Sequence, residues 1–121
     1  MPEISAGSSL PSTKEASMSN EQQIEEQIVA AGRTAPRVTP ALLDREVAAG
    51  KVVFTKIEGT NITHCAIVLR NGFSVTGESA CVDPANFDEQ IGRDIALKNA
   101  REKLWPLLGF RLADELYAKN P

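Results

Sequence analysis

The chain has 121 residues and a formal net charge of −3, and its composition is that of a soluble globular protein. This length provides one domain with a modest hydrophobic core. Residues 1–50 carry 4 basic and 7 acidic side chains, and the remaining residues carry 9 of each without a basic run. Duplex nucleic acid is therefore not an expected partner. A small anionic ligand stays open, because it needs only two or three placed cations.

The N-terminus lacks the charged and then apolar pattern of a signal segment, and the longest apolar runs are far too short to cross a bilayer. We therefore expect a soluble intracellular protein without a membrane partner. The two cysteines, Cys65 and Cys81, are expected to point to opposite faces of a sheet, so they should be buried thiols and not a disulfide.

The N-terminal part divides into a tail and the start of a domain. Residues 1–20 are Ser-rich with few large apolar groups, which predicts a disordered tail. Residues 21–121 are then expected to form a single α+β domain. Residues 21–31 read as a short helix, and a second helix is predicted between a Thr-Pro start at residue 39 and a stop at Gly50.

Three strands are predicted next, over residues 51–57, 61–70 and 73–82, as an antiparallel meander. If Asn71-Gly72 is a two-residue turn, Cys65 lies opposite Glu78.

Both faces of this predicted sheet are apolar, unlike those of a sheet with one wet side. One face carries Val52, Phe54, Cys65, Ile67 and Leu69, and the other carries Val53, Ile57, Ile62, Ala66, Val68, Phe73 and Val75. The predicted helices suffice to cover one face fully and the other only in part. We therefore expect a homo-oligomer that buries the remainder.

The C-terminal third predicts a helical hairpin. Asp83 and Pro84 begin a helix that runs to about residue 105, where Pro106 breaks it, and residues 107–119 form a second helix. The first of these helices has two apolar arcs, which again favours a partner. Gly92 in its middle predicts a close approach of another segment.

Most catalytic patterns are missing from the sequence. His64 is the only histidine, so a histidine-based metal cluster is excluded, and no Cys-x-x-Cys, phosphate-binding loop or dinucleotide motif is present. We expect no cofactor and no metal. On the predicted register Thr55, His64 and Ser79 share one row, which is the start of a nucleophilic relay or a plain hydrogen-bonded row. Because no carboxylate lies on that face, we expect no enzyme.

Polar side chains on the hairpin and the following helix are the candidate ligand-binding residues. Glu78 is expected either to pair with Arg93 or Arg101, or to accept a hydrogen bond from a ligand hydroxyl. Arg93 has an acid four residues before it, whereas Arg101 has Leu97 there, which leaves its guanidinium freer for an anion.

Long motifs from Arg37 onward carry a resemblance to a known family. These motifs are R-V-T-P, L-R-N-G-F-S-V-T-G-E-S-A-C-V-D-P-A-N-F-D, I-G-R-D-I-A and K-L-W-P-L-L-G-F-R-L. They resemble the phage gene-49/gene-66 family of small tailed-phage proteins, over about two thirds of the chain and with residues 1–36 outside it. The resemblance implies a phage origin and a location in the cytoplasm of the infected host.

The order of an antiparallel sheet and a helical hairpin is also similar to that of the phage anti-Thoeris sponge proteins. Those proteins form hexamers and hold cyclic ADP-ribose-type signals, or cyclic oligonucleotides, without cleaving them. This similarity implies a pocket between protomers near Asn86, Phe87, Arg93 and Arg101. In that interpretation the two arginines hold phosphates, Asn86 and Glu78 bond ribose or base edges, and Phe87 stacks.

The leading hypothesis is therefore a phage counter-defence protein that sequesters a cyclic nucleotide signal. Two alternatives belong to other classes. One is a non-enzymatic accessory protein of phage DNA metabolism or host takeover, acting through protein contacts of its acidic N-terminal helix. The other is a small hydrolase that uses Ser79 and His64.

Overall fold

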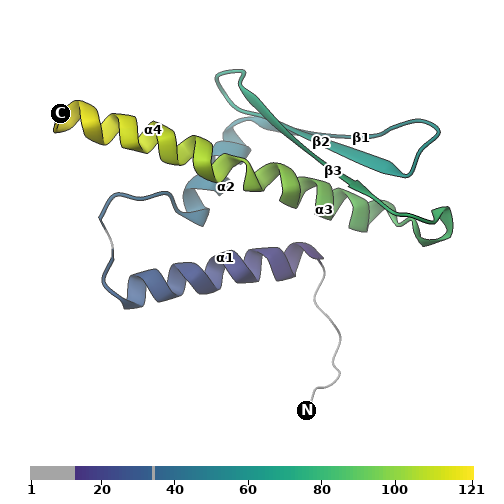
Figure 1. The fold of residues 1–121 in the computed structure, drawn as a ribbon, viewed down its shortest axis with the longest axis horizontal. Helices are drawn as coiled ribbons and strands as arrows, with labels where there is room; N and C mark the ends of the chain where they lie inside the picture. Colours follow the sequence, from purple (N-terminus) through teal and green to yellow (C-terminus); the bar gives the residue numbers. More distant parts are fainter. Residues whose placement is uncertain (1–12, 34) are drawn as a thin grey trace, which may run out of the picture.

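The computed structural model describes residues 13–33 and 35–121, and its helices and strands are segregated along the chain, as expected for an α+β protein (Figure 1). In chain order they are α1 (Thr13–Ala30), α2 (Pro40–Ala49), β1 (Lys51–Lys56), β2 (Ile62–Val68), β3 (Ser74–Ala80), the 3-10 turn η1 (Pro84–Asn86), α3 (Glu89–Glu102) and α4 (Leu104–Lys119). Residues 1–12 of the predicted tail lie outside the described residues. α1 begins at Thr13, upstream of the helix start expected at residue 21.

The three strands form an antiparallel sheet in the order β1-β2-β3, which confirms the predicted meander. The turn between β2 and β3 has three residues, not two. The amide of Leu69 donates to the carbonyl of Phe73 at 2.7 Å, and the side chain of Asn71 accepts from the Phe73 amide at 3.0 Å. Gly72 takes the positive φ of 91° that this wider turn requires.

The extra turn residue shifts the pairing of β3 by one position, so the expected register was wrong. Since side chains alternate between faces, a shift of one residue exchanges the faces of every β3 side chain. Glu78 therefore pairs with His64 and not with Cys65. Ser79 pairs with Thr63 on the opposite face, and Val75 joins Ile67 on the helix-covered face.

One face of the sheet packs on α3 and builds the core. Cys65, Ile67 and Leu69 from this face are buried with small residues of α3 and with leucines from α2 and α4, which are Leu43, Ala96, Ala100, Leu104 and Leu108. Gly77 lets β3 approach α3 closely, because a Cβ at this position would meet the α3 backbone. Burial raises the pKa of the Cys65 thiol to about 11. Both cysteines are free, as predicted, but only Cys65 is buried, whereas Cys81 is half-buried.

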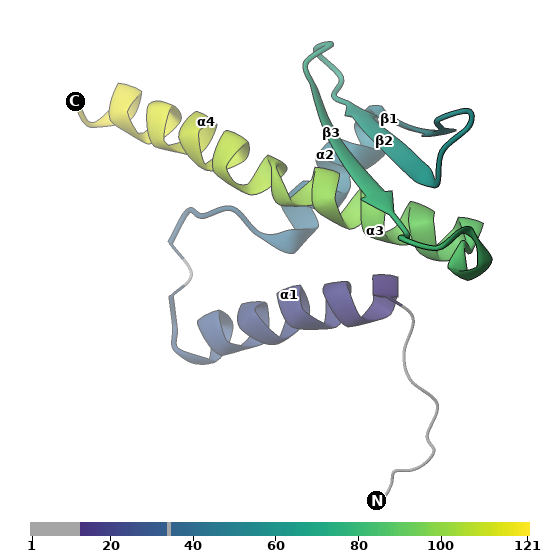
Figure 2. The ribbon, with the colours of Figure 1, turned by 45° about the vertical axis from the view of Figure 1, so that its right-hand side comes forward.

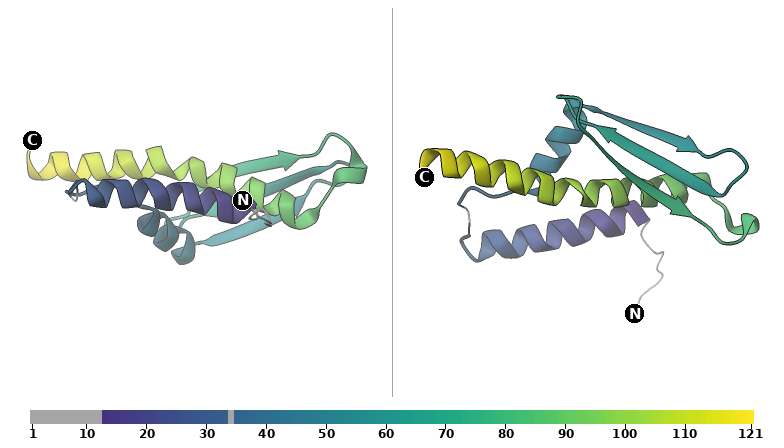
Figure 3. Two further views of the ribbon diagram at one scale, coloured as in Figure 1. Left: turned by 90° about the horizontal axis from the view of Figure 1, so that it is seen from below. Right: turned by 45° about the horizontal axis from the view of Figure 1, so that its top comes forward.

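The other face of the sheet has no helix over it within residues 13–33 and 35–121. Figures 2 and 3 show α3 and α2 on one side of the sheet and open space on the other. β1 contributes Val53 and Thr55 to this open face, and β2 contributes the half-buried Ile62, Ala66 and Val68. The expectation that the helices cover only one face fully is confirmed.

The predicted pair of C-terminal helices is present, but its boundaries differ. Asp83 and Pro84 begin only η1, and Asp88 caps α3 by accepting from the amide of Ile91 at 3.0 Å. The break falls at Lys103 instead of Pro106. Proline is tolerated in the first turn of α4 and is incompatible with the helical bond to the carbonyl four residues earlier, so the helix breaks upstream. In Figure 1, α4 follows α3 along the long axis of the molecule and extends beyond the sheet.

Candidate functional site

Arg101 is held by two carboxylates that lie far away in the sequence. Its guanidinium contacts Glu21 of α1 at 2.9 Å and Asp44 of α2 at 2.9 Å, and it also donates to the carbonyl of Pro40 at 3.3 Å. Burial disfavours the charged form, but the carboxylates more than offset it, so the pKa of Arg101 is raised. The side chain is only 15 % exposed. The premise that this guanidinium is free for an anion was therefore wrong.

Arg93 lies about 12 Å from Arg101 along α3, at 1.5 Å per residue. It pairs with Glu89 at 2.8 Å, as the acid-first spacing predicts, and its guanidinium carbon lies 5.5 Å from the centre of the Phe54 ring. The two arginines thus act at separate places, and no contact joins Arg93 to the Arg101 cluster among the described residues.

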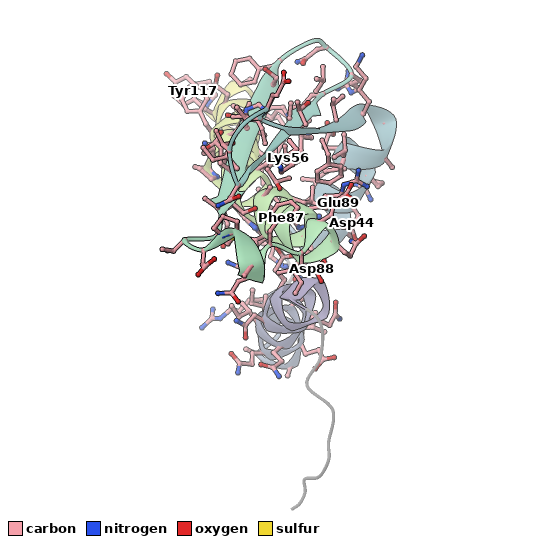
Figure 4. The ribbon with its side chains drawn as sticks, turned by 90° about the vertical axis from the view of Figure 1, so that its right-hand side faces the viewer. Asp44, Lys56, Phe87, Asp88, Glu89 and Tyr117 are labelled. Atoms are coloured by element: carbon pink, nitrogen blue, oxygen red, sulfur yellow. The ribbon has the colours of Figure 1, made fainter. Side chains whose placement is uncertain are left out.

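Asn86 and Phe87 lie at the end of the molecule that precedes α3. Both line a small hollow of about 60 Å³, together with residues of β3 and α3 that include Ser79 and Gly92. The ammonium of Lys56 lies 5.1 Å from the centre of the Phe87 ring, and Figure 4 shows these two side chains next to each other. Two cations over two aromatic rings therefore gather at this end, from β1, from α3 and from Phe87 just after η1.

Glu78 lies on the open face of the sheet, where its carboxylate is 3.4 Å from Nε2 of His64. The expected partners Arg93 and Arg101 contact other acids. Ser79 is on the opposite face and donates to the carbonyl of Gly92 at 2.7 Å. The row of Thr55, His64 and Ser79 does not form, because the register differs. Gly92 is closely approached by Thr63 and Ser79, as its position in the helix predicted.

A larger groove lies between α1 and α3, and sequence reasoning did not find it. Its volume is about 410 Å³, and its apolar lining comes from Ile24, Ile28, Val38, Pro40 and Trp105. Glu25 of α1 forms a two-pronged pair with Arg37 at 2.6 and 2.7 Å, and hydrogen bonding to this guanidinium lowers the pKa of Glu25. Two charged clamps thus hold α1: the Glu21–Arg101 pair ties it to α3, and the Glu25–Arg37 pair ties it to the linker that leads to α2.

No local sequence pattern predicts these two ion pairs. Glu21 and Arg101 are 80 positions apart, and Glu25 and Arg37 lie in different segments. The surplus of acidic residues in the first half of the chain was the one relevant signal.

Other site types lack support within residues 13–33 and 35–121. These residues contain no group of three or more His, Cys, Asp or Glu side chains placed to hold a metal ion. In the same part of the chain, no helix is long and apolar enough to span a membrane.

The model of the phage protein (N4 Gp49/phage Sf6 gene 66) family matches residues 20–116. The match begins upstream of the expected start at Arg37 and takes in the second half of α1. No curated protein and no solved structure matches the chain. The similarity to anti-Thoeris sponges therefore remains a hypothesis.

Proposed function

Since the chain belongs to the phage protein (N4 Gp49/phage Sf6 gene 66) family, we propose that it is a non-enzymatic phage protein that acts by binding, through the open face of its sheet. Its first partner on this face is a second copy of the chain. Assembly then provides the surface or pocket with which the protein acts in the host.

The open face is the observation that supports this proposal. Its cross-strand rows are Lys51–Val68–Ser74, Val53–Ala66–Thr76, Thr55–His64–Glu78 and Ile62–Ala80. Apolar side chains of β2 and β1, chiefly Ile62, Ala66, Val68 and Val53, thus form an apolar strip on a face that also carries polar groups. Sheets readily pack face to face in pairs, and such a strip is suited to that packing.

The arrangement around Ser79 supports a binding role over hydrolysis. A serine nucleophile needs a base within hydrogen-bonding reach. Ser79 instead donates to a helix carbonyl, and the only histidine points to the other face of the sheet.

Light scattering at micromolar concentration tests the proposal. The wild-type protein should have a mass several times 13.1 kDa. Ala66→Arg places a charge at the centre of the open face, where the side chain points to solvent, and should lower this mass. Ala48→Arg makes the same change on an exposed position of α2 and should not. A wild-type monomer, or equal effects of the two variants, would contradict the assembly on this face.

A second candidate function is sequestration of a cyclic nucleotide. The cations over Phe87 and Phe54 favour it, because aromatic faces and nearby cations suit bases and phosphates. The adjoining hollow of about 60 Å³ is well below the roughly 300–1,000 Å³ of ligand pockets, so a second protomer must complete it. Arg101 is engaged in the ion pair with Glu21 of α1, so it is not part of this candidate site.

Calorimetry with cyclic di- and trinucleotides and cyclic ADP-ribose isomers separates the two candidates. In the sequestration hypothesis, Phe87→Ala weakens binding while the assembly keeps its mass, and the ligand recovered after heating is unchanged. Absence of binding by the whole panel would leave the protein-contact function alone.

A further inference from the structure

A second apolar hollow lies between α4 and the turn that joins β2 to β3. Its volume is about 360 Å³. Leu69, Leu107 and Leu108 form its floor, and Phe73 and Phe110 contribute aromatic rings. These two rings are 55 % and 69 % exposed, so the walls of the hollow face water in a single chain. The hollow is separate from both the open sheet face and the α1 groove.

The rim of this hollow is polar and carries both charges. Asn71 lies on the turn side, and Arg111, Asp114 and Glu115 lie on the α4 side. Arg111 also contacts Glu46 at 3.2 Å, but its side chain remains 38 % exposed. An apolar floor with a wet, hydrogen-bonding rim suits a tyrosine, whose ring is apolar and whose hydroxyl needs a polar partner.

The chain itself displays such a tyrosine. Tyr117 is its only tyrosine, is 67 % exposed, and stands at the edge of the molecule (Figure 4). Phe110, Ala113 and Tyr117 follow one another at spacings of three and four residues, so they form one stripe of α4. All three are exposed. The exposed ring of Tyr117, called the knob below, and the Phe110 wall of the hollow thus lie on the same helix, with the small Ala113 between them.

We propose that Tyr117 of a second copy occupies this hollow, and that the contact is made twice across a two-fold axis. When two α4 helices cross antiparallel near Ala113, Tyr117 of each copy lies beside Phe110 of the other. A self-complementary patch of this kind is what a two-fold interface requires. The tyrosine ring packs on Phe110 and Phe73, and its hydroxyl reaches the rim at Arg111 or Asp114. This interface does not depend on the open sheet face or on the proposed function.

Charge supports a second copy as the occupant. Arg111 and Asp114 both lie on the rim, three residues apart. In an antiparallel pair that crosses near Ala113, Arg111 of each copy comes near the acidic Asp114 and Glu115 of the other, so opposite charges meet across the two-fold axis. A strongly acidic partner would instead meet two carboxylates and one guanidinium that already contacts Glu46.

Sedimentation in the Ala66→Arg background isolates this interface from the sheet face. Ala66→Arg should still form dimers, and adding Tyr117→Ala should weaken them by about tenfold or more, as expected for a central aromatic anchor. Tyr117→Phe keeps the ring and should lose much less. Val29→Ala, at a position 52 % exposed on α1, is the control and should change nothing. A monomeric Ala66→Arg protein, or a Tyr117→Ala dimer as tight as the control, would overturn the proposal.

A mixing experiment tests the reciprocal geometry. Phe73→Ala damages the hollow but keeps the knob, whereas Tyr117→Ala removes the knob but keeps the hollow. A mixed dimer of the two has one intact knob-in-hollow contact, and each homodimer has none. Native mass spectrometry in the Ala66→Arg background should therefore show mixed dimers above the statistical proportion. A purely statistical distribution would contradict the assignment of Tyr117 to this hollow.

Discussion

Arg101 shows how strongly the role of one side chain depends on distant partners. Its local helix neighbours offer no acid, yet it is the most fully paired cation among the candidate site residues. Glu21, Asp44 and the Pro40 carbonyl all accept from it. Three segments therefore meet at one guanidinium, and its planar fork is suited to several oxygens at once.

We predict that Arg101→Ala destabilises the fold. The variant leaves Glu21, which is 15 % exposed, without its counter-charge. An unsatisfied buried polar group costs about 1–3 kcal/mol. Urea denaturation should show this loss. Arg93→Ala is the control, because its pair with Glu89 is exposed, and it should cost less than about 1 kcal/mol. Equal stability of wild type and Arg101→Ala would show that the clamp contributes nothing.

At the scale of elements, α1 differs from the other helices in how it is held. Within the part of the chain that the structure describes, it contributes no residue to the hydrophobic core. Ile24 and Val29 of α1 are exposed, and the groove beneath it is open. Two arginine–carboxylate clamps provide its specific attachment, so α1 should respond to pH more than the sheet does.

We predict that acidification loosens α1 before it unfolds the core. Hydrogen bonding to Arg37 lowers the pKa of Glu25 below 4.5, so the stabilisation is full above that value. It is lost as the pH falls through the lowered pKa. Trp105 is the only tryptophan and lines the groove beside Ile24 and Ile28, so its emission reports on the change. In Glu25→Gln this acid transition should disappear. If it persists unchanged, another group controls it.

The helices and strands could be predicted from the sequence, but the strand register and the contacts between distant segments could be predicted only in part. Alternating apolar residues and turn signals located β1, β2 and β3. The register was missed by one residue because Asn71-Gly72 fits both a two-residue and a three-residue turn, and only the Leu69–Phe73 bond decides between them. That shift alone exchanged the faces of Glu78 and Ser79. Contacts across 80 residues, such as Glu21 with Arg101, leave no local pattern.

At the scale of the whole molecule, the described helices cover only one face of the sheet. The sheet, α3 and leucines of α2 and α4 form the core, α1 contributes no residue to it, and α4 extends past the sheet (Figure 1). The sequence predicted two apolar sheet faces, but the register of β3 places Ser74, Thr76 and Glu78 on the open one. The sequence could not place the hollow under Phe73 and Phe110, because a loop and a helix 37 positions apart meet there only in the fold.

We predict that a chain starting at residue 35 keeps the fold of the sheet, α3 and α4. The core residues all lie downstream of this point, since the first of them is Leu43. Circular dichroism should show the strands and the remaining helices, with a cooperative but lower melting transition. Emission of Trp105 should shift to the red, because removing α1 uncovers the groove. A truncated chain that does not fold would show that α1 is part of the core structure.

Combining the truncation with Arg101→Ala tests how α1 is attached. In the full chain this substitution breaks the contacts with Glu21, Asp44 and the Pro40 carbonyl, but in the truncated chain only those with Asp44 and Pro40 remain to be lost. Asp44 is 58 % exposed, and exposed pairs contribute little, so the substitution should cost less than about 1 kcal/mol there. The two changes should therefore be strongly non-additive in urea denaturation. Additive losses of stability would mean that contacts other than the Arg101–Glu21 pair hold α1. The attachment of α1 would then not depend on the charge of Arg101.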